Sequence, residues 1–369
     1  DWRLGAFYIG NYPTKATFYE ERLIYANTDS HPNTVWGSVS GDFDTFSPSG
    51  ADATIADSDG LNFTLSSDQV NQITGMYGGK YLHLFTKNGT FNMSSGSATQ
   101  GLSPTTVQVI NETNDGAADK KVIPASKSTL YIGKNKKRLR EFAYNIDYDS
   151  YTSPDMTVLS EHLGFGNFEE AYFANYPNNV VWVRRGDGKL LGFTYYRNQD
   201  VTAWHQHTIA GTNAKVKSIA TIPGVNDAYD TVYMIVERTI NSATKQYVEF
   251  LEEEYREADG HTKDDAFFLD SGLSYSGGST TSISGLDHLE GETVTVLNNG
   301  AVESTKTVSS GAITLTNATT KCHVGLAYDA ELESVNVEPK SQYGTTQGKR
   351  GRIDKCIFRV FETVGLKAG

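Results

Sequence analysis

The chain has 369 residues, a formal net charge of −12 and a sequence pI near 5.2. This acidic balance argues against a surface that grips the nucleic-acid backbone, because such surfaces are usually basic. The sequence has no run of roughly 18 apolar residues that would span a membrane, and it begins with neither the basic nor the apolar segment of a signal peptide. Its 21 Tyr, 17 Phe and 35 Gly are typical of a globular protein rich in strands and turns.

A repeat of about 50 residues runs through the first two thirds of the chain. Its copies are marked by apolar positions spaced 47, 48, 51 and 51 residues apart, which are Val35, Leu82, Leu130, Val181 and Val232. A strand-like run precedes each of these positions, namely ATFYEERLIYA (16–26), VNQITGMY (70–77), KKVIPA (120–125), EEAYFA (169–174) and KSIATI (217–222).

Turns and further strands follow the marked positions. Asn88-Gly89 and Asp187-Gly188 predict hairpin turns, and the turn at Asp187-Gly188 is expected to need a positive φ, which glycine readily takes. The fifth copy has a longer connection, INSATK (240–245). A fourth strand is expected at TTVQVI (105–110), MTVLSE (156–161) and DVTAWHQHT (200–208).

Copies of about four short antiparallel strands indicate an all-β fold, a β-propeller of about five blades. We expect the propeller to span residues 1–258. Because residues 252–266 offer no fourth strand for the last blade, residues 2–7 (WRLGAF) are expected to supply it and close the ring.

The remaining residues, 259–369, predict a small antiparallel, β-sandwich-like domain. ETVTVL (292–297) and GAITL (311–315) alternate apolar and polar residues as strands do, LNNGAV (297–302) has the pattern of a hairpin, and KCIFRVFET (355–363) predicts a further half-buried strand. Cys322 and Cys356 are expected to be small core residues, with a disulfide between two strands as the alternative.

The sequence contains several residues of catalytic type, and each has a simpler explanation. His205 and His207 would share one face of a strand, as a metal pair needs, but without a third ligand nearby we expect them to face solvent. The acidic run Glu252–Glu254 is expected to be solvated, and His288 to lie in a turn. No nucleophile elbow, zinc-protease, P-loop or dinucleotide motif is present. We therefore predict no catalytic, cofactor-binding or metal-binding residue.

Two basic clusters interrupt the acidic sequence and are candidate docking points for an acidic neighbouring subunit. One lies on the central hairpin of the third copy and the other near the C-terminus. Their residues are Lys134, Lys136, Lys137, Arg138 and Arg140 in the first, and Lys349, Arg350 and Arg352 in the second.

Several segments, in order, resemble the C-terminal half of a phage protein family. They are WRLGAF, NYPTKATFYEERLIYANTDSHPNTVWGSVSGDFDTF, VVWVRRGDGKLLGFTYYRNQDVTAWHQHT, GLDHLEGETVTVLNNG, VGLAY and GTTQGKRGRI. The family is the tail tubular protein B, or tail nozzle, of short-tailed bacteriophages, together with related prophage tail proteins. The resemblance covers most of the 369 residues, but family members carry an additional N-terminal region.

The resemblance implies a virion structural protein that forms a hexameric ring, contacts tail adaptor and tail fibre proteins, and surrounds the path of DNA ejection. DNA would pass through without sequence-specific binding. It also implies no enzyme activity, no cofactor and a location in the virion tail after synthesis in the bacterial cytoplasm. The alternative is a glycan-binding or glycan-cleaving β-propeller that acts at a cell surface.

Overall fold

The computed structural model describes residues 7–49, 54–66, 71–97, 99–224, 229–333, 355–360 and 367. Asp1–Tyr328 form one compact unit, and Asp329–Gly369 form a second. The fold is all-β, and the described helices are short 3-10 turns, none of which is long and apolar enough to cross a membrane. The predicted all-β class is confirmed.

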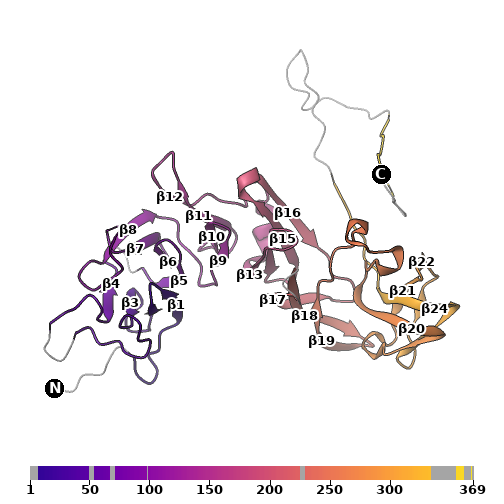
Figure 1. The fold of residues 1–369 in the computed structure, drawn as a ribbon. Coiled ribbons are helices and arrows are strands. Elements are labelled where there is room, and N and C mark those ends of the chain that lie inside the picture. The colour runs from indigo at the N-terminus through magenta and orange to yellow at the C-terminus, as the bar shows by residue number, and fades with distance from the viewer. Residues whose placement is uncertain are drawn as a thin grey trace, which may run out of the picture. The chain divides into compact units, whose positions relative to one another are not determined.

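Five antiparallel sheets follow one another along the chain, each built from strands that are consecutive in sequence (Figure 1). The first four have four strands each and the fifth has three. They are β1 (Lys15–Tyr19), β2 (Arg22–Ala26), β3 (Thr34–Gly37) and β4 (Leu61–Thr64); β5 (Ile73–Gly78), β6 (Leu82–Thr86), β7 (Thr90–Ser94) and β8 (Gln108–Thr113); β9 (Ile123–Ala125), β10 (Ser128–Ile132), β11 (Leu139–Asn145) and β12 (Ser150–Thr152); β13 (Phe168–Ala174), β14 (Val180–Arg185), β15 (Leu190–Tyr196) and β16 (Val201–His207); and β17 (Lys215–Pro223), β18 (Asp230–Ile240) and β19 (Ala243–Phe250).

A sixth sheet follows, with strand order β20-β24-β21-β22 and β23 paired to β21. Its strands are β20 (Asp270–Ser284), β21 (Thr293–Asn298), β22 (Ala301–Val302), β23 (Lys306–Thr307) and β24 (Ala312–Leu326). The 3-10 turns are η1 (Glu161–Gly166), η2 (Arg197–Gln199), η4 (Glu257–Asp259), η5 (Lys263–Asp265) and η6 (Asp287–Leu289). The predicted strands at 292–297 and 311–315 and the hairpin at 297–302 are confirmed, the last with Leu297 paired to Val302.

The repeat has the predicted register in four of its five copies. Leu82, Leu130, Val181 and Val232 each lie buried in the second strand of their sheets. Val35 is equally buried but lies in the third strand, because the run 16–26 folds into two strands instead of the predicted one. Its turn residues, Glu20 and Glu21, both take a positive φ, at 43° and 57°.

Two further predictions about single strands are wrong. The connection in the fifth copy is a two-residue turn, Asn241-Ser242, with φ of 46° and 62°, which is tighter than the predicted INSATK loop. The run 156–161 forms no strand, because β12 already supplies the fourth strand of the third sheet and the chain then turns into η1. Strands at 105–110 and 200–208 are confirmed, the first with shifted bounds.

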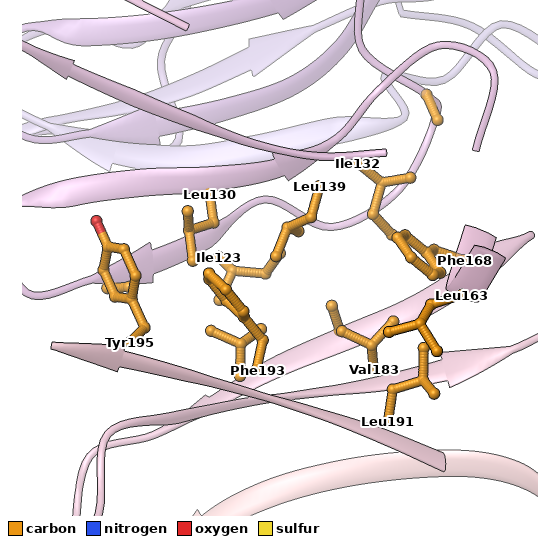
Figure 2. Packing of buried hydrophobic residues seen from close by; sticks show 14 residues of the cluster. Ile123, Leu130, Ile132, Leu139, Leu163, Phe168, Val183, Leu191, Phe193 and Tyr195 are labelled. Carbon is orange, nitrogen blue, oxygen red and sulfur yellow. The ribbon is translucent and has the colours of Figure 1, made fainter. Parts of the chain in front are cut away.

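Each pair of consecutive sheets shares a buried apolar cluster. Between the first and second sheets, Ile24 and Val35 pack with Leu82 and Met93. Between the second and third, Phe85 packs with Tyr131 and Phe142. Leu130 and Leu139 meet Phe168 and Phe193 between the third and fourth, and Leu190 meets Val216 and Met234 between the fourth and fifth. Figure 2 shows the third of these junctions, where Leu130 and Leu139 face Phe193 and Val183 across the gap between two layers of strands. The sheets therefore pack face to face in chain order.

The fifth sheet has three strands, as the sequence predicted for residues up to 250. Of the segment expected to complete it, residues 2–6 lie outside the described residues. The one described member, Phe7, packs on the first sheet, with its ring centroid 5.7 Å from Tyr25, 5.2 Å from Trp36 and 5.8 Å from Phe46.

The C-terminal sheet has its own apolar core, to which the fifth sheet contributes Ile240 and, at its margin, Tyr247. Cys322 is buried in this core, whereas Cys356 is exposed, and both are free, so the core position is confirmed only for Cys322. Residues 355–360 form no strand, contrary to prediction, and their side chains are exposed. The division at residue 258 stays a prediction.

One buried ion pair joins two strands of the fifth sheet. The Arg238 guanidinium is completely buried, contacts both carboxylate oxygens of Glu249 and donates from Nε to the carbonyl of Ala210 at 2.7 Å. A guanidinium cannot lose its charge in a protein, so its stability in the core depends on these acceptors.

Replacing Glu249 with alanine should lower the free energy of unfolding by about 3 kcal/mol, because the buried guanidinium loses its counter-ion. Chemical denaturation followed by tryptophan fluorescence would measure this loss. Glu253→Ala, at an exposed position, is the control and should change stability by less than about 0.5 kcal/mol. Equal effects of the two variants would contradict this account of the pair.

Candidate functional site

The basic hairpin predicted as an interface is the turn between β10 and β11. Its backbone is fixed by hydrogen bonds from the Gly133 amide to the Arg138 carbonyl and from the Lys136 amide to the Gly133 carbonyl, both 2.8 Å long. Lys136 takes a positive φ of 58°, which reverses the chain in few residues. The turn therefore presents its cations from a defined backbone.

Most of these cations pair with acidic or polar side chains of the same chain. Arg138 lies 3.1 Å from Asp155, Arg140 lies 2.9 Å from Asp115, and Lys134 donates to Asn88 at 2.6 Å in the preceding sheet. The exposed side chain of Lys137 makes no ion pair or hydrogen bond with the described residues. The hairpin is thus largely neutralised internally, and its predicted role in docking a neighbouring subunit stays a prediction.

Lys136 connects the hairpin to the next sheet through Glu169 at the start of β13. The carboxylate lies 3.2 Å from Lys136 and 2.5 Å from Lys120. These two ammonium groups, Lys120 foremost, hold the pKa of Glu169 below its ordinary value. The carboxylate therefore stays ionised and links the third and fourth sheets. Lys349, Arg350 and Arg352 of the second cluster lie outside the described residues.

Exposed apolar side chains lie close in sequence to the basic hairpin. Ile146 and Tyr148 form the turn after β11, and Val158, Leu159 and Phe165 follow β12; these five side chains, which we call the third-sheet apolar loops, are 63% to 95% exposed. Apolar side chains this exposed and this close in the chain are candidate contact residues for another protein. Val158 and Leu159 were missed because residues 156–161 were predicted to form a strand, and no sequence pattern marked the other three as exposed.

His205 and His207 lie on one face of β16, as predicted, but are half-buried instead of solvent-facing. His205 Nδ1 and His207 Nε2 are 2.8 Å apart, and both rings pack on Trp182. On the neighbouring strand, a Cβ at Gly192 would lie 2.0 Å from His205 Cε1, so a glycine is needed there. No group of three or more His, Cys, Asp or Glu that could hold a metal ion occurs in the described part of the chain.

The other residues of catalytic type have structural surroundings, as expected. Glu252, Glu253 and Glu254 are exposed, and Glu254 accepts hydrogen bonds from Arg256 and Asn178. His288 lies in η6 and donates from Nε2 to the carbonyl of Ser271 at 2.9 Å. The predictions of a solvated run and of a turn are confirmed.

A cavity of about 580 Å³ between the first and second sheets brings three carboxylates together, those of Glu20, Glu21 and Asp57. Hydrogen bonds from Thr105 and Ser103 lower the pKa of Asp57 below its ordinary value. A general acid for glycoside hydrolysis needs a raised pKa instead. Asp57 is therefore not suited to the general-acid role.

No protein-family model and no curated protein matches the chain. One solved structure similar to it is a luciferin-regenerating enzyme, with 11% sequence identity and a TM-score of 0.25, in an alignment covering 62% of this chain and 85% of that one. A similarity this low supports no conclusion about function.

The histidine pair should make stability depend on pH. Burial, aided by the neighbouring His205, lowers the pKa of His207 to about 4, whereas the unfolded chain binds this proton near pH 6.5. The associated stability is complete above pH 6.5 and is lost as the pH falls towards 4. Between pH 7 and pH 5, wild type should lose roughly 1–2 kcal/mol that His207→Gln does not lose.

Urea unfolding at the two pH values would measure this difference. His162→Gln, at an exposed histidine on η1, is the matched control and should keep the wild-type pH dependence. An unchanged pH dependence in His207→Gln would show that the buried imidazole does not carry the effect.

Proposed function

We propose that the five consecutive sheets are the blades of a β-propeller, with the C-terminal sheet as a separate β-domain. The face-to-face packing of each sheet on the next supports this fold. The first and last sheets each carry exposed apolar side chains. They include Phe18 on the first, with Phe43 of the connection between β3 and β4 against it, and Val248 and Phe250 on the fifth. Closure of a ring would cover both sets, and residues 2–6 would complete the fifth blade, since Phe7 packs on the first sheet.

We further propose that the chain is a phage virion structural protein, a subunit of the tail nozzle that self-assembles into a hexameric ring. The sequence resemblance supplies the kind of assembly. The structural observation that carries the proposal is the set of third-sheet apolar loops, whose exposure is costly in water unless another protein covers them. The chain would act without enzymatic chemistry, and its partners would be its own copies, adaptor and tail fibre proteins.

The mechanism of such a subunit is assembly. Apolar anchors supply the binding energy, and cations such as Lys137, near the same loops, set the register of neighbouring copies. A net charge of −12 disfavours binding to the DNA that would pass through the ring during ejection. The protein would be made in the host cytoplasm and reside in the virion tail.

The alternative, a glycan-cleaving propeller, requires two carboxylates set for acid and nucleophile roles. In the cavity lined by Glu20, Glu21 and Asp57, hydrogen bonds lower the pKa of Asp57, which makes this residue unsuitable as the acid of such a pair. A propeller that binds a glycan without cleaving it would need no such pair of carboxylates.

Light scattering of the purified chain across a concentration range should detect species near six copies. Leu159→Asp and Phe165→Asp each place a charge where an apolar contact is expected, and should raise the apparent dissociation constant at least about tenfold, equivalent to about 1.4 kcal/mol. A chain that remains monomeric at every concentration and salt level would contradict self-assembly.

Val302→Asp is the matched control, since Val302 is similarly exposed but lies on β22 in the C-terminal sheet. It should leave the distribution of species unchanged. Equal loss of assembly in all three variants would show that added negative charge, and not the apolar loops, governs association.

A further inference from the structure

A second cavity, of about 470 Å³, lies where the second, third and fourth repeats meet. Its volume falls in the range of roughly 300–1,000 Å³ that small-molecule sites occupy. Its lining comes from β5, β6 and the turn between them, from β10 and the turn before it, and from β11, β12 and η2. No single repeat could form this cavity, because the lining residues come from three of them.

One wall of the cavity is a continuous set of aromatic rings. The His83 ring lies 5.2 Å from Phe142 and 5.2 Å from Tyr151, measured between centroids, and Phe142 stacks on Tyr151 at 4.9 Å. Tyr77 stacks on His83 at 6.2 Å, and Tyr144 meets Tyr151 edge-on at 5.7 Å. Aromatic walls of this kind offer large, flat contact areas to a ring-shaped ligand.

His83 is held in place by a chain of hydrogen bonds that reaches the next sheet. Its Nδ1 is 2.5 Å from Asn92 Oδ1, Asn92 donates to Glu112 at 2.7 Å, and Glu112 accepts from the Tyr151 amide at 3.2 Å. Burial lowers the pKa of His83, so its imidazole is neutral at neutral pH. Nε2 makes no hydrogen bond with the described residues and remains available as a neutral polar contact.

The charged residues of the cavity are all cations. Lys80, Lys127 and Arg197 line it, and no Asp or Glu is among the described lining residues. Arg197 contacts the buried carboxylate of Glu141 through Nε, and its two terminal nitrogens form no hydrogen bond with the described residues. Glu141 also accepts from Tyr195 at 2.7 Å, which fixes the carboxylate beneath the guanidinium. The site is therefore set to receive an anion.

Hydroxyl groups complete the lining. Ser126, in the turn before β10 and next to the cationic Lys127, is exposed, whereas Ser128 and Thr129 at the start of β10 are buried, and the Ser128 hydroxyl already bonds to the Ala125 carbonyl and the Tyr195 hydroxyl. Hydroxyls can both donate and accept hydrogen bonds, and so can the hydroxyls of a sugar. The lining contains no Asn or Gln side chain among the described residues, and these are the amides that most often read the edges of adenine bases.

We propose that this cavity binds an acidic sugar, a pyranose that carries a carboxylate. The aromatic wall would contact the face of the sugar ring, the exposed Ser126 hydroxyl would meet one of its hydroxyls, and Lys127 and Arg197 would bind its carboxylate. Because no carboxylate lines the cavity to serve as acid or nucleophile, the site would bind the sugar without cleaving it. This assignment does not depend on the tail-subunit proposal, since either could hold without the other.

Isothermal titration calorimetry of the full chain with three acidic probes would test the assignment. The probes are tri-galacturonate, D-glucuronate and N-acetylneuraminate. Maltotriose, which has pyranose rings and no carboxylate, is the neutral comparison. We expect at least one acidic probe to bind, at least ten times more tightly than maltotriose. Lys127→Glu, at an exposed lining residue, should weaken that binding at least tenfold, and Tyr144→Leu should also weaken it.

Lys245→Glu makes the same charge change at an exposed lysine of β19, outside the cavity, and should leave binding unchanged. The proposal is overturned if none of the three acidic probes binds at 10 mM, if maltotriose binds equally well, or if both lysine variants weaken binding alike. It is also overturned if an oligothymidylate binds through Lys127 more tightly than every acidic sugar, since the site would then be one for nucleic acid.

Discussion

The repeated sheets of this protein have apolar side chains on both faces, and water is a poor solvent for either face. In β6 and β10 all five residues are buried, which is possible only when a neighbouring sheet covers each side of the strand. A single repeat could not satisfy this requirement, and each sheet depends on the next, as in other repeat proteins. The packing between sheets, and not any property of one sheet, therefore determines where cores, cavities and exposed apolar groups lie.

Carboxylates reinforce each of the four junctions between consecutive sheets. Glu20 accepts a hydrogen bond from the Leu102 amide, Glu112 from the Tyr151 amide at 3.2 Å, Glu141 from the Tyr195 hydroxyl at 2.7 Å, and Glu170 from the Ile219 amide at 2.9 Å. Each bond crosses from one repeat to its neighbour. Part of the acidic excess is thus structural, and the net charge is an incomplete guide to the surface that other molecules meet.

Local patterns predicted local features well. The buried positions Leu82, Leu130, Val181 and Val232 follow from the regular spacing of the repeat, and Asp187-Gly188 turns the chain with Gly188 at a φ of 93°. The turn that divides residues 16–26 into two strands had no signal in the sequence, because Glu20-Glu21 is not a usual turn pair. It is held there by its neighbours, with the Glu20 carboxylate bound to the Leu102 amide.

Features that depend on distant residues could not be predicted from the sequence. The basic hairpin looked like a free patch because its partners, Asp115, Asp155 and Glu169, are far from it in the sequence. His205 and His207 looked solvent-facing because their cover, Trp182, belongs to another strand. The cavity residues Tyr77, Tyr151 and Arg197 come from three repeats and share no spacing that a motif could reveal.

The two cavities show how one architecture can carry different chemistry. Both lie at junctions between consecutive repeats, and twisted sheets packed face to face leave space where their ends diverge. The residues that fill that space are not fixed by the core: the first junction has Glu20, Glu21 and Asp57, whereas the second has Lys80, Lys127 and Arg197. Since the two cavities differ in lining elements and in charge, binding specificity in this protein must be analysed junction by junction.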